Sequence, residues 1–240
     1  MIAYFLTFRH RGDPGTRLGA AEQARFAALM RATPGLKKAL IFTPARAHDP
    51  YLKDEPPPFF AAQLYFSDIE ALEAALAQDG HLQALASAPE FPGLAAAEAT
   101  QQAMVVRSFA VPEPAFRTKP GELACTYLVS YEGMAENLHL WLSHYIAQHS
   151  PIMKRFPGIR ELEIYTRLDW CGFLPWRRVD YMQRNKVVFD DAASLNAALN
   201  SPVRHEMRID FSKFPPFTGG NTHYPMATLR LGPDPSTGSG

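Results

Sequence analysis

Hydrophobic and polar positions follow the same series of patterns twice along the chain. Each series starts with an apolar, aromatic-rich run that predicts a strand, followed by a helix-spaced stretch that ends at a Pro-Gly pair. Two further strands, a second helix that begins at an aspartate, and a final strand complete the series. The predicted strands are 1–10, 36–44, 59–67 and 101–110, then 124–132, 159–167, 179–189 and 224–231, and the predicted first helices are 18–33 and 136–155.

A shift of 123 residues aligns the two series without a gap. Pro34-Gly35 falls on Pro157-Gly158, and Phe91-Pro92 falls on Phe214-Pro215. We therefore predict a tandem duplication of a ferredoxin-like β-α-β-β-α-β unit. In one such unit both helices cover the same face of the four-stranded sheet, so the other face is left exposed. The expected fold is thus α+β, with two βαββαβ repeats packed sheet to sheet as an α/β barrel within one chain. The predicted domains are an N-terminal repeat 1–112, a Pro-rich linker 113–122, a C-terminal repeat 123–231 and a flexible tail 232–240.

Composition narrows the class of protein. The 240 residues carry 24 Lys and Arg against 24 Asp and Glu. This balance argues against electrostatic binding of nucleic acid or anionic lipid. No apolar run is long enough for a membrane span, and the first ten residues read as a strand instead of a signal peptide. We expect a cytoplasmic protein, with no disulfide scaffold and no metal site, since the chain has only Cys125 and Cys171.

One polar residue distinguishes the repeats. His149 lies at the centre of the apolar stripe of helix 136–155, where the first repeat has Phe26. A core histidine bonded to a carbonyl is the alternative to a functional one. Pro151 should kink or end the helix beside His149, and the same repeat holds all three tryptophans. His144, five residues earlier, is expected to point into solvent. With His149 as the catalytic residue, the candidate substrate-binding residues are Tyr127, Tyr131, Trp141, Tyr145, Tyr165, Trp170, Trp176, Tyr181, Arg184, His205 and His223.

The segment 136–158 resembles the EthD-like family of dimeric α/β barrels. The resemblance rests on Trp141, His144, His149-Ser150-Pro151 and Phe156-Pro157-Gly158, and covers the second repeat. The first repeat matches only in pattern. The resemblance implies a pocket between helices and sheet that the histidine faces. It also implies relatives that include cofactor-free isomerases, cyclases, dehydratases and haem enzymes.

The leading hypothesis is cofactor-independent proton transfer. A buried imidazole stays neutral and can act as a base near neutral pH. Aromatic walls suit a small aromatic, polyketide-like or lactone substrate, giving a lyase, isomerase or cyclase reaction. Arg184, Tyr181, His205 and His223 could anchor a carbonyl, a carboxylate or a developing enolate. For Arg184, however, a surface salt bridge is the favoured interpretation, and for His205 an exposed position on a helix is favoured. Trp170 and Trp176 are expected to pack the long loop between the second and third strands of the repeat.

Two alternatives remain open. The first is a haem protein with His149 as axial ligand, although no carboxylate for the other ring nitrogen and no basic cluster for propionates stands out in the sequence. The second is a non-catalytic protein that binds a small hydrophobic ligand. The apolar surplus also allows a homodimer.

Overall fold

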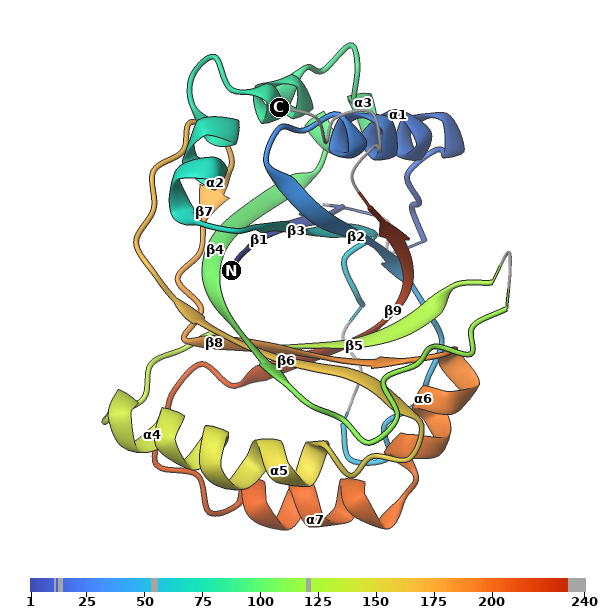
Figure 1. Ribbon diagram of the computed structural model, residues 1–240, viewed down its shortest axis with the longest axis vertical. Coiled ribbons are helices and arrows are strands. Elements are labelled where there is room, and N and C mark those ends of the chain that lie inside the picture. The colour runs from blue at the N-terminus through green and yellow to red at the C-terminus, as the bar shows by residue number, and fades with distance from the viewer. Residues whose placement is uncertain (11, 13–14, 53–55, 120–121, 233–240) are drawn as a thin grey trace.

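Eight antiparallel strands close into a barrel to which the two halves of the chain contribute equally (Figure 1). The computed structural model describes residues 1–10, 12, 15–52, 56–119 and 122–232. Around the barrel the strand order is β1-β3-β2-β9-β5-β8-β6-β4, and β4 pairs back onto β1. The last strand of each half also pairs with the second strand of the other half, β4 with β6 and β9 with β2. These exchanged strands join the two sheets into one closed barrel.

Each half contains the β-α-β-β-α-β order. The first half consists of β1 (Ile2–Arg9), α1 (Ala20–Arg31), β2 (Leu36–Pro44), β3 (Phe60–Phe66), α2 (Ile69–Leu76), the 3₁₀ helix η1 (His81–Ala86), α3 (Pro92–Ala95) and β4 (Glu98–Phe109). The second consists of β5 (Ala124–Tyr131), α4 (Leu138–His144), the π-helical turn η2 (Tyr145–His149), α5 (Ser150–Met153), β6 (Ile159–Arg167), β7 (Arg177–Arg178), β8 (Gln183–Phe189), α6 (Ala192–Leu199), α7 (Pro202–Phe211) and β9 (Asn221–Leu231). The predicted α+β fold of two βαββαβ repeats packed as a barrel is confirmed.

Equivalent turns end and begin the helices of both halves. Gly35 and Gly158 have φ angles of 74° and 76°, which is the left-handed region that glycine adopts without strain. The carboxylates of Asp68 and Asp191 accept backbone N–H groups at distances of 2.9 and 2.7 Å and cap α2 and α6. Both pairs are separated by 123 residues, as the offset predicts. The duplication itself stays a prediction.

Alternate strand residues face two different environments. Side chains such as Phe5, Tyr65 and Tyr165 pack inside the barrel, whereas their sequence neighbours pack under helices. Helices α1 and α2 lie over the outer face of the first half, and α4 to α7 lie over that of the second (Figure 1). Because both faces are buried, the strands are apolar at both parities.

The long loops between the second and third strands cross to the opposite half. In the chain segment 168–176, Trp170 and Trp176 pack their rings on Tyr4 and Phe8 at centroid distances of 5.4 and 5.0 Å. In return, Asp49, from the loop between β2 and β3, forms an ion pair with Arg204 of the second half. Each half therefore contributes side chains to the core that lies between the sheet and the helices of the other half.

In the predicted linker 113–122, residues 120 and 121 lie outside the described residues, as do residues 233–240 of the predicted tail. The predicted helix 136–155 runs from 138 to 153 as α4, η2 and α5, so Pro151 does not end it. Among the described residues, no helix has the length and apolarity needed to cross a bilayer.

Candidate functional site

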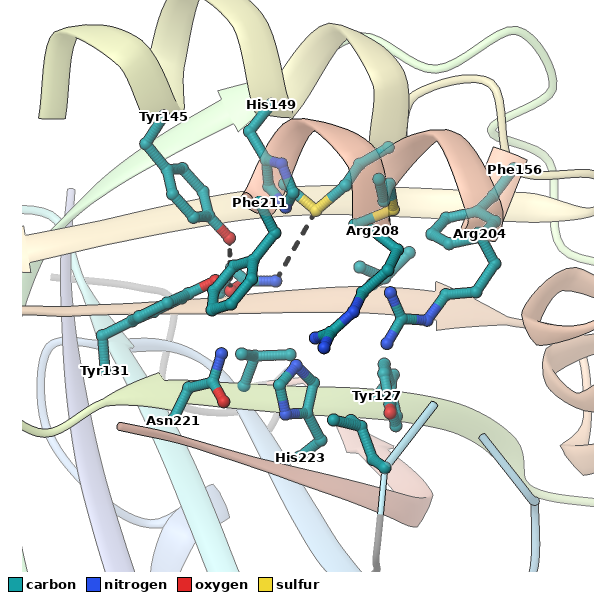
Figure 2. A pocket seen from close by; sticks show the side chains of 16 residues that line it. Tyr127, Tyr131, Tyr145, His149, Phe156, Arg204, Arg208, Phe211, Asn221 and His223 are labelled. Carbon is teal, nitrogen blue, oxygen red and sulfur yellow. Dashed lines mark hydrogen bonds between the residues drawn. The ribbon is translucent and has the colours of Figure 1, made fainter. Parts of the chain in front are cut away.

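A pocket lies between the helical layer of the second half and the outer face of strands β5, β8 and β9 (Figure 2). It encloses about 550 Å³, including its opening to solvent. Helices supply one wall and strands the other. The lining residues are Leu52, Tyr127, Val129, Tyr131, Tyr145, His149, Met153, Phe156, Asn185, Val187, Arg204, Met207, Arg208, Phe211, Asn221 and His223.

His149 is held in this wall by a carboxylate. Its Nδ1 lies 2.8 Å from Oδ2 of Asp210, a residue in the last turn of α7. The imidazole ring packs against Tyr145 and Phe214 at centroid distances of 4.9 and 4.8 Å, and His149 is 4% exposed. A carboxylate accepts a proton, so the neutral ring carries its hydrogen on Nδ1 and keeps a lone pair on Nε2. Within the described chain, no hydrogen bond occupies Nε2.

The π-helical turn explains how His149 reaches Asp210. The backbone N–H of Ser150 donates to the carbonyl of Tyr145, five residues earlier, and the Ser150 hydroxyl donates to the same oxygen at 2.9 Å. Five residues complete about one turn of such a helix. His144 therefore lies on the same side as His149, with its Nε2 3.2 Å from Oδ1 of Asp210. The prediction that His144 points into solvent is wrong, because it assumed ideal α-helical rotation.

Burial sets the charge state of the imidazole. Desolvation lowers the pKa of His149 to about 4, and the hydrogen bond to Asp210 opposes only part of this shift. The ring is therefore neutral at pH 7. Should Nε2 accept a proton, the Asp210 carboxylate would stabilise the imidazolium.

Cationic side chains from α7 form the side of the pocket nearest the loop of the first half. Nε of Arg204 donates to Oδ2 of Asp49 at 2.8 Å, and the hydroxyl of Tyr127 donates to the same oxygen at 2.8 Å. The ion pair with Asp49 holds the side chain of Arg204 in place and gives its buried charge a counter-ion. Arg208, one helical turn later, is exposed, and its guanidinium points into the pocket above His223 (Figure 2). Arg208 thus offers donors to a bound anion or carbonyl.

Protonated hydroxyls and a neutral imidazole complete the polar lining. Tyr145 donates to Oδ1 of Asn185 at 2.9 Å, and desolvation raises its pKa well above the usual value. Desolvation also raises the pKa of Tyr131 to about 12. The pKa of His223 falls to about 3, because burial and the nearby charge of Arg204 both disfavour its protonation. These three groups are uncharged at neutral pH.

The structure brings five of the predicted site residues together. His149, Tyr127, Tyr131, Tyr145 and His223 all line the pocket (Figure 2). Trp141 lies behind them. It is fully buried, and its ring stacks on Tyr145 at 5.1 Å and meets Tyr131 at 4.9 Å. Its indole thus supports the wall without touching the cavity.

The remaining predicted residues lie elsewhere. Tyr165, Tyr181 and Arg184 lie on the side of the sheet away from His149. Tyr165 packs inside the barrel, Tyr181 precedes β8, and Arg184 has the opposite parity to the pocket residues Asn185 and Val187 of β8. Trp170 and Trp176 pack on the first half, since their loop crosses over. His205 is exposed on α7, and its Nδ1 lies 3.0 Å from the Tyr51 hydroxyl. Arg184 is buried, so the alternative of a surface salt bridge is wrong as well.

Sequence reasoning missed the residues of α7 and of the crossing loop. Asp210, Arg204 and Arg208 follow a Ser-Pro start at 201–202 that could have marked a separate helix. The Arg204–Arg208 spacing of four would then have placed both guanidinium groups on one face. No local signal points to Asp49, which contacts residues 78 and 155 positions away. Within the described residues, no group of three His, Cys, Asp or Glu side chains could hold a metal ion.

Comparisons with known proteins bear on the fold. No family model matches the chain, and no curated protein matches its sequence. A protein described as anthrone oxidase-like superimposes with a TM-score of 0.61 at 10% identity, over 96% of this chain and 92% of its own. A candidate monooxygenase from Fusobacterium nucleatum subsp. nucleatum gives 0.57 at 11% identity, over 95% and 92%. Another, from Lactobacillus acidophilus NCFM, gives 0.53 at 9% identity, over 96% of both chains. The chain has the dimeric α/β-barrel fold that the resemblance to EthD-like proteins implied, with both halves of the barrel supplied by one polypeptide.

Proposed function

We propose that the protein is a small-molecule enzyme that uses His149 as a general acid–base in cofactor-independent proton transfer. The observation that carries the proposal is the 2.8 Å contact between Nδ1 of His149 and Asp210, in a pocket wall where Nε2 has no described partner. A carboxylate on one ring nitrogen fixes the tautomer and leaves the other nitrogen as the base. A purely structural core histidine needs no such free nitrogen beside a cavity.

The lining indicates the class of substrate. Tyr131, Phe156 and Phe211 provide apolar ring surfaces, and Arg208 provides an exposed cation. A flat, largely apolar molecule with one carbonyl group matches both features. Its C–H bond next to the carbonyl system must be acidified for an imidazole to remove the proton.

The proposed reaction begins with a proton transfer from a substrate carbon to His149. Nε2 of His149 takes the proton of the acidified C–H, and the electron pair of that bond moves into the carbonyl to form an enolate. The guanidinium of Arg208 stabilises the enolate oxygen, while Asp210 stabilises the imidazolium. Return of the proton to a different carbon gives isomerisation. Loss of a leaving group from the neighbouring carbon, with proton transfer to it, gives elimination.

Proton exchange from anthrone tests the proposal. Anthrone is a flat ketone with acidified methylene protons, and the name of one structural neighbour points to this type of molecule. Under anaerobic conditions in D₂O, the protein should speed deuterium incorporation into anthrone beyond the rate in buffer. His149→Phe should reduce the rate to that of buffer while the protein stays folded, since the first half has Phe26 at this position.

Two results would contradict the catalytic proposal. If the wild-type protein binds anthrone without speeding exchange, and His149→Phe binds it equally well, the pocket carries or sequesters a ligand. If exchange is equally fast in both proteins, His149 is not the base. Equilibrium dialysis alongside the exchange measurement separates these results.

Haem binding is the second candidate, and two features that the sequence did not reveal favour it. Asp210 accepts from the ring nitrogen that would not ligate iron, and Arg204 and Arg208 are cations that could meet propionates. In this case His149 would hold the iron through Nε2, and haem would supply redox chemistry at the pocket. Mixing the purified protein with haem should then give a Soret band that shifts in His149→Ala. An unchanged spectrum in that variant would remove the assignment.

A further inference from the structure

A second cavity opens at one end of the barrel, on the opposite face of the sheet from His149. It encloses about 560 Å³ and leads to a smaller space of about 280 Å³ inside the barrel. Leu128, Ser130 and Arg184 line this opening, whereas their neighbours Val129 and Asn185 line the first pocket. Because successive strand residues face opposite sides, the sheet separates the two cavities. We call the second one the barrel mouth.

Arg184 lies in the wall of the barrel mouth with an incomplete set of partners. It is 8% exposed, and its Nε donates to Oε1 of Gln102 at 3.2 Å. The guanidinium carbon lies 4.8 Å from the ring centre of Phe5 and 4.6 Å from that of Tyr181. Among the described residues, no hydrogen bond satisfies its two Nη atoms and no carboxylate forms an ion pair with it. The guanidinium thus lies close to two aromatic rings and bonds through Nε, while its two Nη groups are available to a ligand.

The other buried cations show what is missing. Three further basic residues of the described chain are buried, and each has a carboxylate partner. Lys186 lies 2.9 Å from Glu161, Arg160 lies 2.8 Å from Asp190, and Arg204 lies 2.8 Å from Asp49. Arg184 alone among these four has none. A buried charge without a counter-ion is costly, and burial lowers the pKa of Arg184 to about 10.

The rest of the barrel mouth favours an anion with an apolar body. Arg9 donates to the Tyr224 hydroxyl at 2.7 Å, and Arg177 lies at the rim, 3.6 Å from Glu98. The two acidic lining residues, Glu98 and Glu132, are exposed. Behind Arg184, the smaller space is lined by apolar side chains. They include Phe5, Phe42, Ala61 and Leu128.

We propose that the barrel mouth binds a small organic carboxylate, which Arg184 holds through the two Nη groups at the free edge of its guanidinium. A planar carboxylate matches the fork geometry of arginine and supplies the missing single negative charge. The apolar part of the ligand packs against the barrel interior. This site is independent of the proton-transfer proposal, because no residue lines both the barrel mouth and the pocket of His149.

Benzoate and benzamide form a matched pair of probes, because they share size and shape and differ in charge. Calorimetric titration of the full-length protein should show benzoate binding at least tenfold more tightly than benzamide. Arg184→Met should abolish this preference and also raise the Tm of the ligand-free protein, since an apolar side chain replaces an unpaired buried charge. Arg117→Gln is the control, at an exposed arginine that does not line this cavity, and should change benzoate affinity less than twofold.

Benzoate could also meet Arg208 in the first pocket, so Arg208→Gln is titrated in parallel and should leave the Arg184-dependent binding unchanged. The proposal is overturned if wild-type protein shows no preference for benzoate, or if Arg184→Met keeps the preference. Equal binding of inorganic phosphate, lost in the same variant, would overturn the assignment to a carboxylate. A large fall in Tm for Arg184→Met with unchanged binding would show that Arg184 is structural. Should Arg184→Met not fold, Arg184→Lys tests the fork, and it should weaken benzoate binding at least fivefold.

Discussion

Asp210 is the residue on which the proposed chemistry of His149 depends. Its carboxylate lies within 2.8 Å of His149 and 3.2 Å of His144, so one anion orients two imidazole rings. The presence of a histidine on this helix does not by itself show whether the residue acts as a base or only packs in the core. The proposed mechanism takes His149 as the base, because His149 is buried at the pocket wall and His144 does not line it.

Asp210→Asn should separate orientation from charge. The amide oxygen can still accept from Nδ1, but it cannot stabilise an imidazolium, so we expect anthrone exchange to slow by about 10²-fold or more. Because Asp210 raises the pKa of His149, that pKa should fall further in the variant. Deuterium incorporation and histidine NMR titration measure the two effects. Asp180→Asn, an exposed partner of Arg167, is the control and should change neither.

The lowered pKa of His149 also predicts how stability depends on pH. The unfolded chain binds a proton at His149 near pH 6.5 and the native state only near pH 4, so the unfolded state holds more protons between these values. The free energy of unfolding should therefore fall as the pH drops from 6.5 to 4, by about 2–3 kcal/mol from this residue. Urea denaturation at several pH values measures the fall. In His149→Phe this part should vanish, and an identical pH dependence in both proteins would contradict the buried neutral imidazole.

At the scale of elements, local patterns predict what local physics controls. Strands 36–44 and 159–167 appear at the predicted bounds, because a Pro-Gly pair precedes each strand and its glycine has a positive φ. The π-helical turn is different. Its hydrogen bond joins residues five positions apart, Ser150 and Tyr145, and the 3.6-residue period of an α-helix does not predict such a bond. The position of His149 was thus predictable, whereas that of His144 was not.

The helix caps give an element-scale test of the equivalence of the two halves. Asp191→Ala removes an acceptor that lies 2.7 Å from the Ser194 N–H, and we expect a loss of about 1 kcal/mol in the free energy of unfolding. Asp68→Ala removes the equivalent contact of α2 and should cost a similar amount. Chemical denaturation of both variants provides the comparison. A negligible cost in one of them would show that only the other cap supports its helix.

At the scale of the whole molecule, the crossing loops make each half part of the other. The sequence predicted two repeats and a barrel, since the 123-residue offset and the bare sheet faces are visible in it. It did not predict that Trp170 and Trp176 pack on the first half, because contacts over more than 100 residues leave no local pattern. Residues assigned by repeat, such as Trp170, were therefore placed in the wrong half.

Trp170→Ala tests this exchange by stability. Trp170 is 6% exposed, packs its ring on Tyr4 and lies under the guanidinium of Arg178. Its removal should cost about 3–5 kcal/mol in the free energy of unfolding, because a large cavity opens in the core of the first half. The pH dependence of anthrone exchange should stay unchanged, because the loop does not touch the pocket of His149. A shift in that profile would mean that Trp170 contributes to the site after all.

Asp49→Asn tests the contact that the first half makes with the second. Unlike Trp170→Ala, it should change the pH profile of exchange as well as the stability. Asp49 comes from the first half, but it neutralises Arg204 at 2.8 Å and accepts from Tyr127 beside the pocket. Asparagine keeps an acceptor for Tyr127 and removes the charge, so Arg204 stays buried without a counter-ion, at a cost of about 3 kcal/mol in the free energy of unfolding. The uncompensated cation should also lower the pKa of His149, since Arg204 already acts on it in that direction. The acid limb of the exchange profile should then move to lower pH, which Trp170→Ala does not cause at comparable loss of stability. Equal profiles in the two variants would mean that the loop of the first half only packs against the site and takes no part in its electrostatics.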